Sequence, residues 1–438
     1  MKKGWKIIIA TMAVAVITIV VVAVAGKADK RVEALRGMQH FFEVSTESQM
    51  NQYLDYCWFE DMFYEKDMQL SGELYSDIAK FTVKAEVEGT IDKSNRMVKM
   101  AGNAGLGGMP FVEMELYSDD TNVYLASELF QDKLLKLNYT ENLYEVGSNY
   151  GINRRNMIIL QKGYIELFRM AVSQSKYEKL EELLNKKQLS KDLVQIYDHM
   201  KVEKQDNTDT QAGGYIYQVN FRAEDIKLFL QDLAVEYPEF ESNGYSDIVN
   251  KFVSEEKGVE ITEIVDGNGF TSELSVENVE NGYELVLKRN EQEKEDNSGF
   301  ESSFSTTVTK DGNGILNGEI VLDYSDADKA FQLTAREDIT GISAIVSGLI
   351  TTDKKEGKIS IDTGKVQMEF RNANIEMYGN TEIVFGDYTV ELPEGKQVDV
   401  LHGEAKELQE VKAEILHHLK GMVGSAFRQF LGSIGLNF

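Results

Sequence analysis

The segment FTVKAEVE, residues 81–88, decides how the chain is interpreted. Apolar side chains occupy every second position in it, at Phe81, Val83, Ala85 and Val87. In an extended chain, successive side chains point to opposite faces, so a period of two gives one apolar and one polar face. The segment therefore predicts a β-strand with one face buried and the other in water.

The same alternation recurs in both halves of the chain. Val112, Met114 and Leu116 alternate with Glu113 and Glu115, and apolar residues two apart continue from residue 274 to residue 377. Four dipeptides predict tight hairpin turns, because glycine, asparagine and aspartate tolerate positive φ: Asp266-Gly267, Asn281-Gly282, Asp311-Gly312 and Asn317-Gly318. We interpret the glycine-rich residues 102–108 as a connection between strands. The alternation and the turns together predict antiparallel meanders.

Other stretches have the spacing of amphipathic helices. These are residues 27–43, 48–65, 154–204, 225–237 and 404–431, whereas residues 338–350 do not distinguish helix from loop. In residues 48–65 the aromatic side chains are interpreted as a stripe that packs on a sheet rather than as a platform for an aromatic ligand. The order predicts an α+β fold of two antiparallel, curved, half-barrel-like sheets, residues 66–255 and 256–438, each covered by helices.

The amino-terminal residues have the composition of a membrane anchor. Residues 7–26 carry no charge and follow Lys2, Lys3 and Lys6. As one helix they match a hydrocarbon core of about 30 Å. We predict a cytoplasmic stub over residues 1–6, a single-pass signal anchor over residues 7–26 and juxtamembrane helices over residues 27–65, with the bulk of the chain extracytoplasmic. Cleavage after Ala25 would instead give a secreted protein.

Charge and cysteine content narrow the classes of function. The 438 residues include 73 acidic and 46 basic side chains, a net charge of −27, which argues against binding to nucleic acid. A single cysteine, Cys57, excludes a disulfide within the chain and a cysteine-based zinc site. The hydrophobic content of 42% is enough for a folded core.

Motifs for catalysis or metal binding are not recognisable. The five histidines are not spaced as metal ligands: His40, His199, His402, His417 and His418. Residues 266–269 and 311–314 begin like calcium loops, but Phe270 and Ile315 stand where a ligand is required. Glu113 and Glu115 are close enough on one strand for a glycosidase pair, yet a solvated strand face is the simpler interpretation. We predict no enzyme activity, no cofactor and no metal.

Three segments of the chain resemble the LolA- and LppX-like exported lipoproteins. They are residues 72–87, residues 113–125 and residues 214–233, the last with the sequence GYIYQVNFRAEDIKLFLQDL. The resemblance concerns hydrophobic pattern and element order over about half of the chain. It implies an open half-barrel of antiparallel strands that wraps helices around an apolar cavity. The chain lacks the lipobox cysteine of that family, and this departure counts against lipid carriage.

Two functional hypotheses follow. The first is a membrane-tethered binding protein that holds a lipid-like apolar ligand between sheet and helices. Its site would consist of the inward side chains Phe81, Val83, Val87, Val112, Met114 and Leu116. The second is a non-catalytic structural or interaction ectodomain of the cell envelope with a fully packed core. The size of an apolar cavity distinguishes them.

The carboxy-terminal stretch is unusually apolar. Residues 422–438 contain one charged side chain, Arg428. They are interpreted as the last helix packing on the second sheet, or else as a plug for a partner or for the chain's own cavity.

Overall fold

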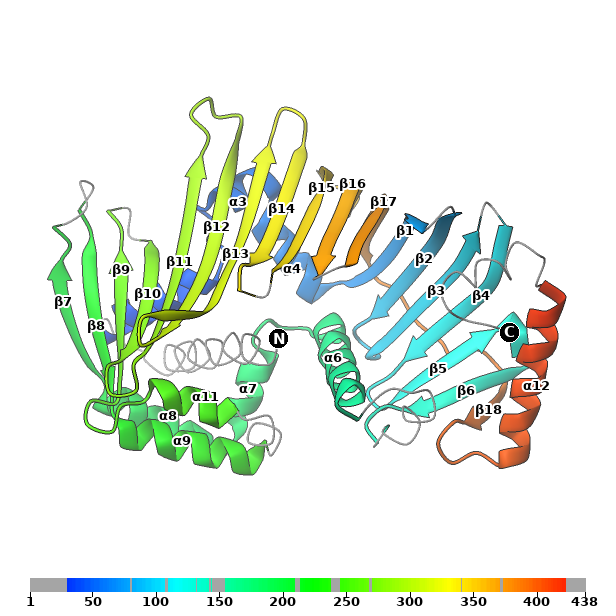
Figure 1. The fold of residues 1–438 in the computed structure, drawn as a ribbon, viewed down its shortest axis with the longest axis horizontal. Coiled ribbons are helices and arrows are strands. Elements are labelled where there is room, and N and C mark those ends of the chain that lie inside the picture. The colour runs from blue at the N-terminus through cyan, green and yellow to red at the C-terminus, as the bar shows by residue number, and fades with distance from the viewer. Residues whose placement is uncertain are drawn as a thin grey trace. The chain divides into compact units, whose positions relative to one another are not determined.

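A computed structural model of the chain describes residues 30–78, 81–106, 109–130, 132–141, 143, 154–208, 213–237, 245–267, 270–339, 341–370 and 373–422. The strands belong to one 18-stranded sheet (Figure 1). The prediction of two separate sheets is therefore wrong. The reason lies in β1 (Asp67–Ile78), which pairs antiparallel with β2 (Phe81–Asp92) on one side and with β17 (Ala373–Gly386) on the other.

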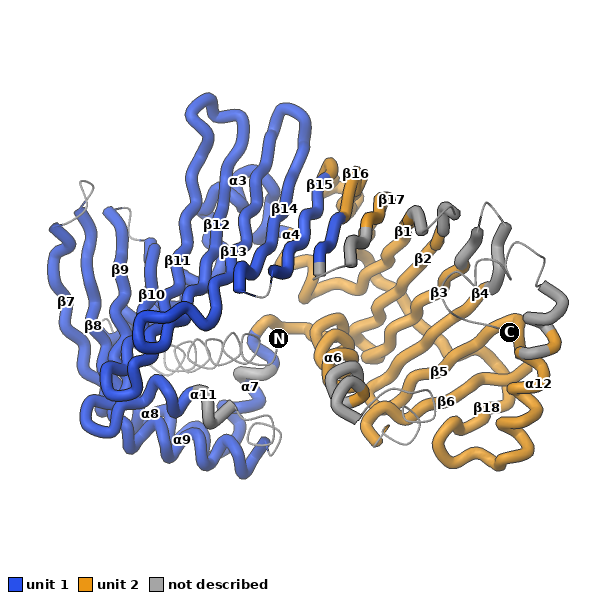
Figure 2. The backbone as a smooth tube through the Cα atoms, in the orientation of Figure 1, with its two compact units in different colours: residues 1–58, 177–347, 367–374 blue, residues 59–176, 348–366, 375–438 orange. Residues whose placement is uncertain are grey.

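The chain forms two compact units (Figure 2). Unit 1 comprises residues 1–58, 177–347 and 367–374, and unit 2 comprises residues 59–176, 348–366 and 375–438. Four elements contain residues of both units: α4 (Tyr56–Glu65), β15 (Ile342–Asp353), β16 (Lys358–Phe370) and β17. Of residues 338–350, which the sequence left between helix and loop, residues 342–350 lie in β15.

Unit 1 is a layer of helices on an antiparallel meander. Its helices are α2 (Lys30–Phe42), α3 (Gln49–Leu54), α7 (Glu178–Asn185), α8 (Lys187–His199), α9 (Ala223–Glu236) and α11 (Tyr245–Phe252). Its strands are β7 (Lys201–Asp206), β8 (Tyr215–Phe221), β9 (Val259–Val265), β10 (Thr271–Asn278), β11 (Tyr283–Glu293), β12 (Gly299–Lys310), β13 (Asn313–Ser325) and β14 (Ala330–Glu337). From β7 to β14, each strand pairs antiparallel with the next.

The core of unit 1 lies between these two layers. Leu35 and Phe41 of α2, Leu193 of α8 and Phe229 of α9 pack in one buried cluster with inward residues of β8 to β12, such as Ile261. The apolar residues of the strands occupy alternate positions, as the period of two requires. This close packing positions α2 firmly on the sheet.

One carboxylate is buried in unit 1. Glu263 of β9 is fully buried, and its Oε1 accepts a hydrogen bond of 2.6 Å from the hydroxyl of Thr271. A Cβ at Gly37 would lie 2.0 Å from that oxygen, so only glycine permits α2 to approach the strand here. Removal from water raises the pKa of Glu263 to about 8.

The local turn signals have mixed outcomes. Asp311 and Gly312 have φ of 51° and 75° between β12 and β13, which confirms the predicted hairpin turn. The turn predicted at Asn317-Gly318 is wrong, because both residues pair with β12 inside β13. The predicted helix over residues 48–65 is interrupted at Asp55, whose φ of 54° separates α3 from α4.

The aromatic residues of α3 and α4 pack on strands, as predicted. In unit 1 the ring of Tyr53 stacks on Phe300 at a centroid distance of 5.8 Å. In unit 2 the ring of Phe59 meets Phe385 edge-on at 6.0 Å.

Unit 2 has a sheet that runs from β17 through β1 and β2 to β3 (Met97–Leu106), β4 (Met109–Ser118), β5 (Asn122–Ser127) and β6 (Lys133–Asn138). All these pairs are antiparallel, and β18 (Lys396–Asp399) then joins β6 in parallel. The helical elements are α6 (Arg154–Val172), the short 3-10 helix η1 (Glu128–Phe130) and α12 (Ala405–Met422). The predicted last helix, residues 404–431, is thus confirmed as far as residue 422, and its remainder lies outside the described residues.

The predicted location, a cell membrane crossed once with the bulk of the chain extracytoplasmic, is also corrected. Over the described ranges between residues 30 and 422, no helix is both long and apolar enough to cross a bilayer. The longest two there, α6 and α12, carry charged side chains along their length. Residues 7–26 and Ala25, on which the anchor and cleavage predictions rest, lie outside the described residues.

Candidate functional site

The candidate site is one face of the unit 2 sheet, and the strand register defines it. Residues directly opposite each other in an antiparallel pair have their side chains on the same face. Met114 is opposite Gly102, Gly102 is opposite Val87, and Val87 is opposite Gly72. These four residues form the Met114 row, which crosses four strands and spans about 14 Å at ~4.8 Å per strand.

Two further rows flank it on the same face. The Met100 row consists of Leu116, Met100, Gly89 and Leu70. The Leu74 row consists of Val112, Ala104, Ala85 and Leu74. All twelve residues of the three rows are apolar or glycine, and together they are called the apolar face below.

The predicted site residues come together on this face. Val87, Val112, Met114 and Leu116 belong to its rows, and Phe81 and Val83 occupy β2 positions of the same parity as Val87. Among the six, the structure describes the side chains of Val87, Met114 and Leu116. Met114 is exposed, and Val87 and Leu116 are partly buried. The strand register thus places these six positions on one face of the sheet.

A helix covers one end of this sheet face. The row next to the Met100 row consists of Ser118, Val98, Ile91 and Met68. Three of these four residues are buried, and the Ser118 hydroxyl is hydrogen-bonded to the hydroxyl of Tyr164 of α6. The same helix contacts β2 and β3. Helix α6 therefore covers this row of residues, which is called the Ser118 row below.

Beyond that row, three side chains of the apolar face are exposed to solvent. The exposed fraction is 48% for Met100, 44% for Met114 and 39% for Leu74. Of the predicted inward side chains, Met114 is among these three and is exposed rather than buried between sheet and helices. Large exposed apolar patches on a protein surface are typical of interaction sites.

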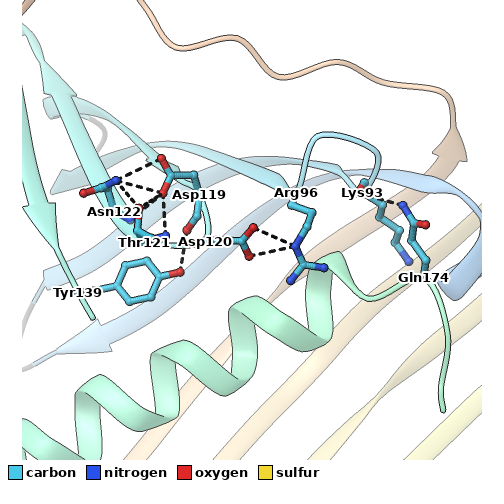
Figure 3. A network of polar contacts seen from close by, with 8 residues as sticks. All are labelled: Lys93, Arg96, Asp119, Asp120, Thr121, Asn122, Tyr139 and Gln174. Carbon is cyan, nitrogen blue, oxygen red and sulfur yellow. Dashed lines mark hydrogen bonds and ion pairs between the residues drawn. The ribbon is translucent and has the colours of Figure 1, made fainter. Parts of the chain in front are cut away.

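A polar network fixes α6 against the turns at the covered end (Figure 3). Gln174, just after α6, donates to the carbonyl of Lys93 at 3.1 Å, and the Lys93 ammonium donates to the carbonyl of Ser173 at 3.1 Å. In the facing turn, the hydroxyl of Tyr139 donates to the carbonyl of Asp119 at 2.7 Å. Arg96 pairs with Asp120 at 3.0 Å. The contacts of Gln174 and Ser173 with Lys93 attach the end of α6 to this turn, whereas the other two contacts lie within and between the turns.

Lys93 is the buried cation of this network. Its side chain also donates to the carbonyl of Phe63 and lies 4.8 Å from the centre of that aromatic ring. Burial lowers the pKa of Lys93 to about 8, although the negative charge of Asp67 opposes the shift.

The opposite face of the same strands is polar. Lys84 lies 2.6 Å from Glu86 and 2.9 Å from Glu73, and the ring of Tyr75 stacks on Tyr378 at 5.3 Å. Hydrogen bonds from Tyr75 and Lys84 lower the pKa of Glu73. Exposed ion pairs of this kind contribute little to stability, but they suit a surface in water. The two faces of the sheet thus differ in chemistry.

A cavity of about 320 Å³ opens on the polar face. Its lining includes Glu113, Glu115, Glu128, Asp132, Lys133 and Glu394. Partial burial alone would raise the pKa of Glu115, but Lys99 at 2.6 Å and the Tyr117 hydroxyl at 2.8 Å outweigh it and lower that pKa. Because Glu115 is held as a carboxylate, it is poorly suited to donate a proton, which favours the interpretation of the pair as a strand face.

A second cavity, of about 210 Å³, lies in unit 1 between the end of α2 and β11. Arg289 in its lining donates to the carbonyls of His40, Phe41 and Glu43 at 3.1, 3.1 and 2.6 Å. These carbonyls at the end of α2 otherwise lack helical partners, so Arg289 acts as a helix cap. Arg289 therefore has a structural role in this cavity.

The histidines make separate contacts. His199 lies 2.8 Å from Asp225, and His402 lies 2.7 Å from Glu141. In the parts of the chain that the structure describes, no group of three or more His, Cys, Asp or Glu side chains is arranged to hold a metal ion.

Sequence reasoning missed the glycines and Met100. We interpreted residues 102–108 as a connection, but Gly102 lies within β3. The available signal was the alternation of Val98, Met100, Gly102 and Ala104 with Lys99 and Asn103. Small residues concealed the period of two, because glycine also predicts turns.

Comparison with known proteins does not assign the chain. No protein-family model matches it, and no curated protein matches it. Among solved structures, "Crystal structure of MucB in complex with MucA(peri)" has 5% identity over 76% of this chain and 92% of that chain, with a TM-score of 0.12. Pseudomonas aeruginosa OccK5 (OpdH) has 6% identity over 73% of this chain and 97% of that chain, with a TM-score of 0.17. These scores are too low to indicate a shared fold.

Proposed function

We propose that the protein is a non-catalytic binding protein that holds one acyl chain of a lipid on the apolar face of unit 2. The observation that carries the proposal is the set of exposed apolar side chains Leu74, Met100 and Met114 beside a row already covered by α6. Each Å² of apolar surface that a ligand removes from water favours binding by about 25 cal/mol.

The side chains favour a flexible apolar ligand. Methionine is unbranched and polarisable, so Met100 and Met114 can adapt to chains of different shape. In the Met114 row, Gly102 and Gly72 have no side chain, which lets a narrow ligand approach the backbone. An acyl chain laid across the strands would contact each residue of the Met114 row in turn.

The charge of the protein favours a lipid with an uncharged head group. With a net charge of −27, the chain repels anionic ligands such as free fatty acids at long range. Lys84 of β2 and Lys99 of β3 are engaged with glutamates on the opposite face of these strands. A monoacylglycerol has the required single chain without a charge.

The test is a fluorescence titration of the full chain with a pyrene-labelled monoacylglycerol. Met100→Lys and Met114→Lys place a charge on the apolar face and are expected to weaken binding at least tenfold. The matched control is Glu88→Lys, an exposed β2 position on the opposite face of the sheet. Equal binding by the Met114→Lys variant and the unmodified chain would contradict the proposal.

The alternative is a non-catalytic structural or interaction protein. The observation that supports this alternative is the packed core of unit 1, where α2, α8 and α9 form one buried cluster with the sheet. A chain that binds neither the monoacylglycerol nor the corresponding fatty acid, while unfolding cooperatively, would favour this alternative.

A further inference from the structure

We infer that Asp192 of α8 and Asp232 of α9 share one proton, and that this proton holds the two helices together in acid. Loss of the proton as the pH rises toward neutrality then loosens the helical layer of unit 1. The inference does not depend on the proposed function, because the carboxyl pair belongs to unit 1 and the proposed lipid site belongs to unit 2.

Helices α8 and α9 lie side by side (Figure 1), and their polar contacts give the register between them. Lys186, directly before α8, lies 3.3 Å from Glu236 at the end of α9. Gln195, later in α8, donates at 2.7 Å to Asp225 in the first turn of α9. Residue numbers therefore rise along one helix as they fall along the other, so the two helices are antiparallel. At both positions a donor or a positive charge faces a carboxylate.

Asp192 lies between these two contacts, opposite the turn of α9 that includes Asp232. Asp192 is 3% exposed, and Gln188 donates to its Oδ1 at 3.0 Å. Its Oδ2 is buried and has no hydrogen-bond partner in the part of the chain that the structure describes. The carboxyl group of Asp232 lies next to it. Two carboxylates without a donor between them repel each other, whereas one shared proton joins them in a short, strong hydrogen bond.

Burial and the neighbouring carboxyl group determine how strongly this proton is held. Removal from water, together with the hydrogen bond and the negative charge of Asp232, raises the pKa of Asp192 to about 6. The opposing effects of Gln188 and Lys191 are smaller. Further charged groups of this layer have partners of their own: Lys186 with Glu236, His199 with Asp225, Glu182 of α7 with Tyr237, and Arg31 of α2 with the carbonyl of Tyr197.

Loss of the proton changes the packing of the two helices. Above about pH 6, two negative charges face each other in a space closed to water, so a separation that lets water reach Oδ2 lowers the free energy of the pair. The proton passes to the solvent, and the O–H bond is the one bond that breaks. Leu193 of α8 and Phe229 of α9 remain in the core of unit 1. The opening is therefore local to the contact between the two helices.

The test is amide hydrogen exchange of the full chain at about pH 5 and about pH 7.5, with each rate divided by the intrinsic rate at that pH. All variants also carry Glu263→Gln, which removes the titration of the buried carboxyl group on β9. We expect the protection of the α8 and α9 amides to be about tenfold lower at the higher pH, while that of β12 around the buried Val308 stays constant. Constant protection in α8 and α9 would overturn the inference.

The variant Asp192→Asn removes the titrating group while keeping the shape of the side chain and a donor for Asp232. Its α8 and α9 amides should have the same protection at both pH values. If Asp192→Asn does not fold, Asp232→Asn tests the same proton from the other helix, with the same expected result. A tenfold change that persists in the folded variant would overturn the inference.

The matched control is His199→Gln, because histidine also titrates in this range and His199 lies 2.8 Å from Asp225 in the same pair of helices. This variant should retain the tenfold change in protection. Loss of the change in His199→Gln, together with its persistence in Asp192→Asn, would assign the pH dependence to the histidine and overturn the inference.

Discussion

Met114 of β4 lies directly opposite Gly102 of β3, so one of the most exposed methionines of the sheet stands next to a position without a side chain. The pair lies at the β4 end of the middle row of the apolar face. Its exposure has a consequence for stability as well as for binding, because a side chain that is in water in the free protein contributes little to the free energy of unfolding.

Met114 and Tyr117 should therefore respond in opposite ways to truncation. Met114→Ala is expected to change the free energy of unfolding by less than about 0.5 kcal/mol. Tyr117 is on the other face of the same strand and 3% exposed, so Tyr117→Ala should cost about 3 kcal/mol. Urea unfolding of both variants measures the difference. A large loss of stability in Met114→Ala would show that this face is buried.

Two glycines of unit 2 should also behave differently. A Cβ at Gly379 would lie 1.9 Å from the carbonyl oxygen of Glu73, so Gly379→Ala is expected to destabilise the protein by about 1 to 3 kcal/mol. At Gly163 in α6, a Cβ would meet no atom within 4 Å, and Gly163→Ala should stabilise by roughly 0.5 to 1 kcal/mol. Thermal unfolding compares them, and stabilisation by both would contradict the β1–β17 pairing.

Glu263 should make stability depend on pH. Its pKa is about 8 in the folded protein against 4.5 when unfolded, so the folded state binds the extra proton between these values. The free energy of unfolding must therefore fall as pH rises from about 4.5 to 8, with a slope of up to roughly 1.4 kcal/mol per pH unit. Glu263→Gln should remove this contribution. Parallel pH profiles for the two proteins in urea unfolding would show that Glu263 is not buried.

Lys93 should act in a higher pH range. Burial lowers its folded pKa to about 8 from 10.5, so between these values the unfolded state binds more protons. The free energy of unfolding should rise with pH over this window, and Lys93→Met should flatten the rise. Arg96→Met removes a charge from the same turn and serves as the control. An identical slope in Lys93→Met would refute the assignment.

The period of two predicted the apolar face but not the sheet to which it belongs. Alternation in residues 81–88 and 112–116 determines which side chains share a face, and the pairing of Val87 with Gly102 and of Gly102 with Met114 confirms it. Alternation carries no information about which strands are neighbours. The β1–β17 pairing joins residues about 300 apart in sequence, such as Leu74 and Gly379, and no local signal predicts it.

Local turn chemistry was reliable only where the strands also ended. Asp311-Gly312 forms a turn, whereas Asn317-Gly318 continues a strand because β12 and β14 hold Gly318 on both sides. Exposure of Met100 and Met114 was equally beyond the sequence. It depends on where α6 is positioned along the strands, which tertiary contacts such as that of Tyr164 with Ser118 decide.

The most direct measurement is methyl NMR of the methionines with a spin-labelled monoacylglycerol. If the acyl chain lies on the apolar face, the paramagnetic label should broaden the methyl signals of Met100 and Met114 while leaving that of Met38, in the buried core of unit 1, unchanged. Saturable broadening at the two exposed methionines would support the account. Unchanged signals from both at saturating lipid would contradict it.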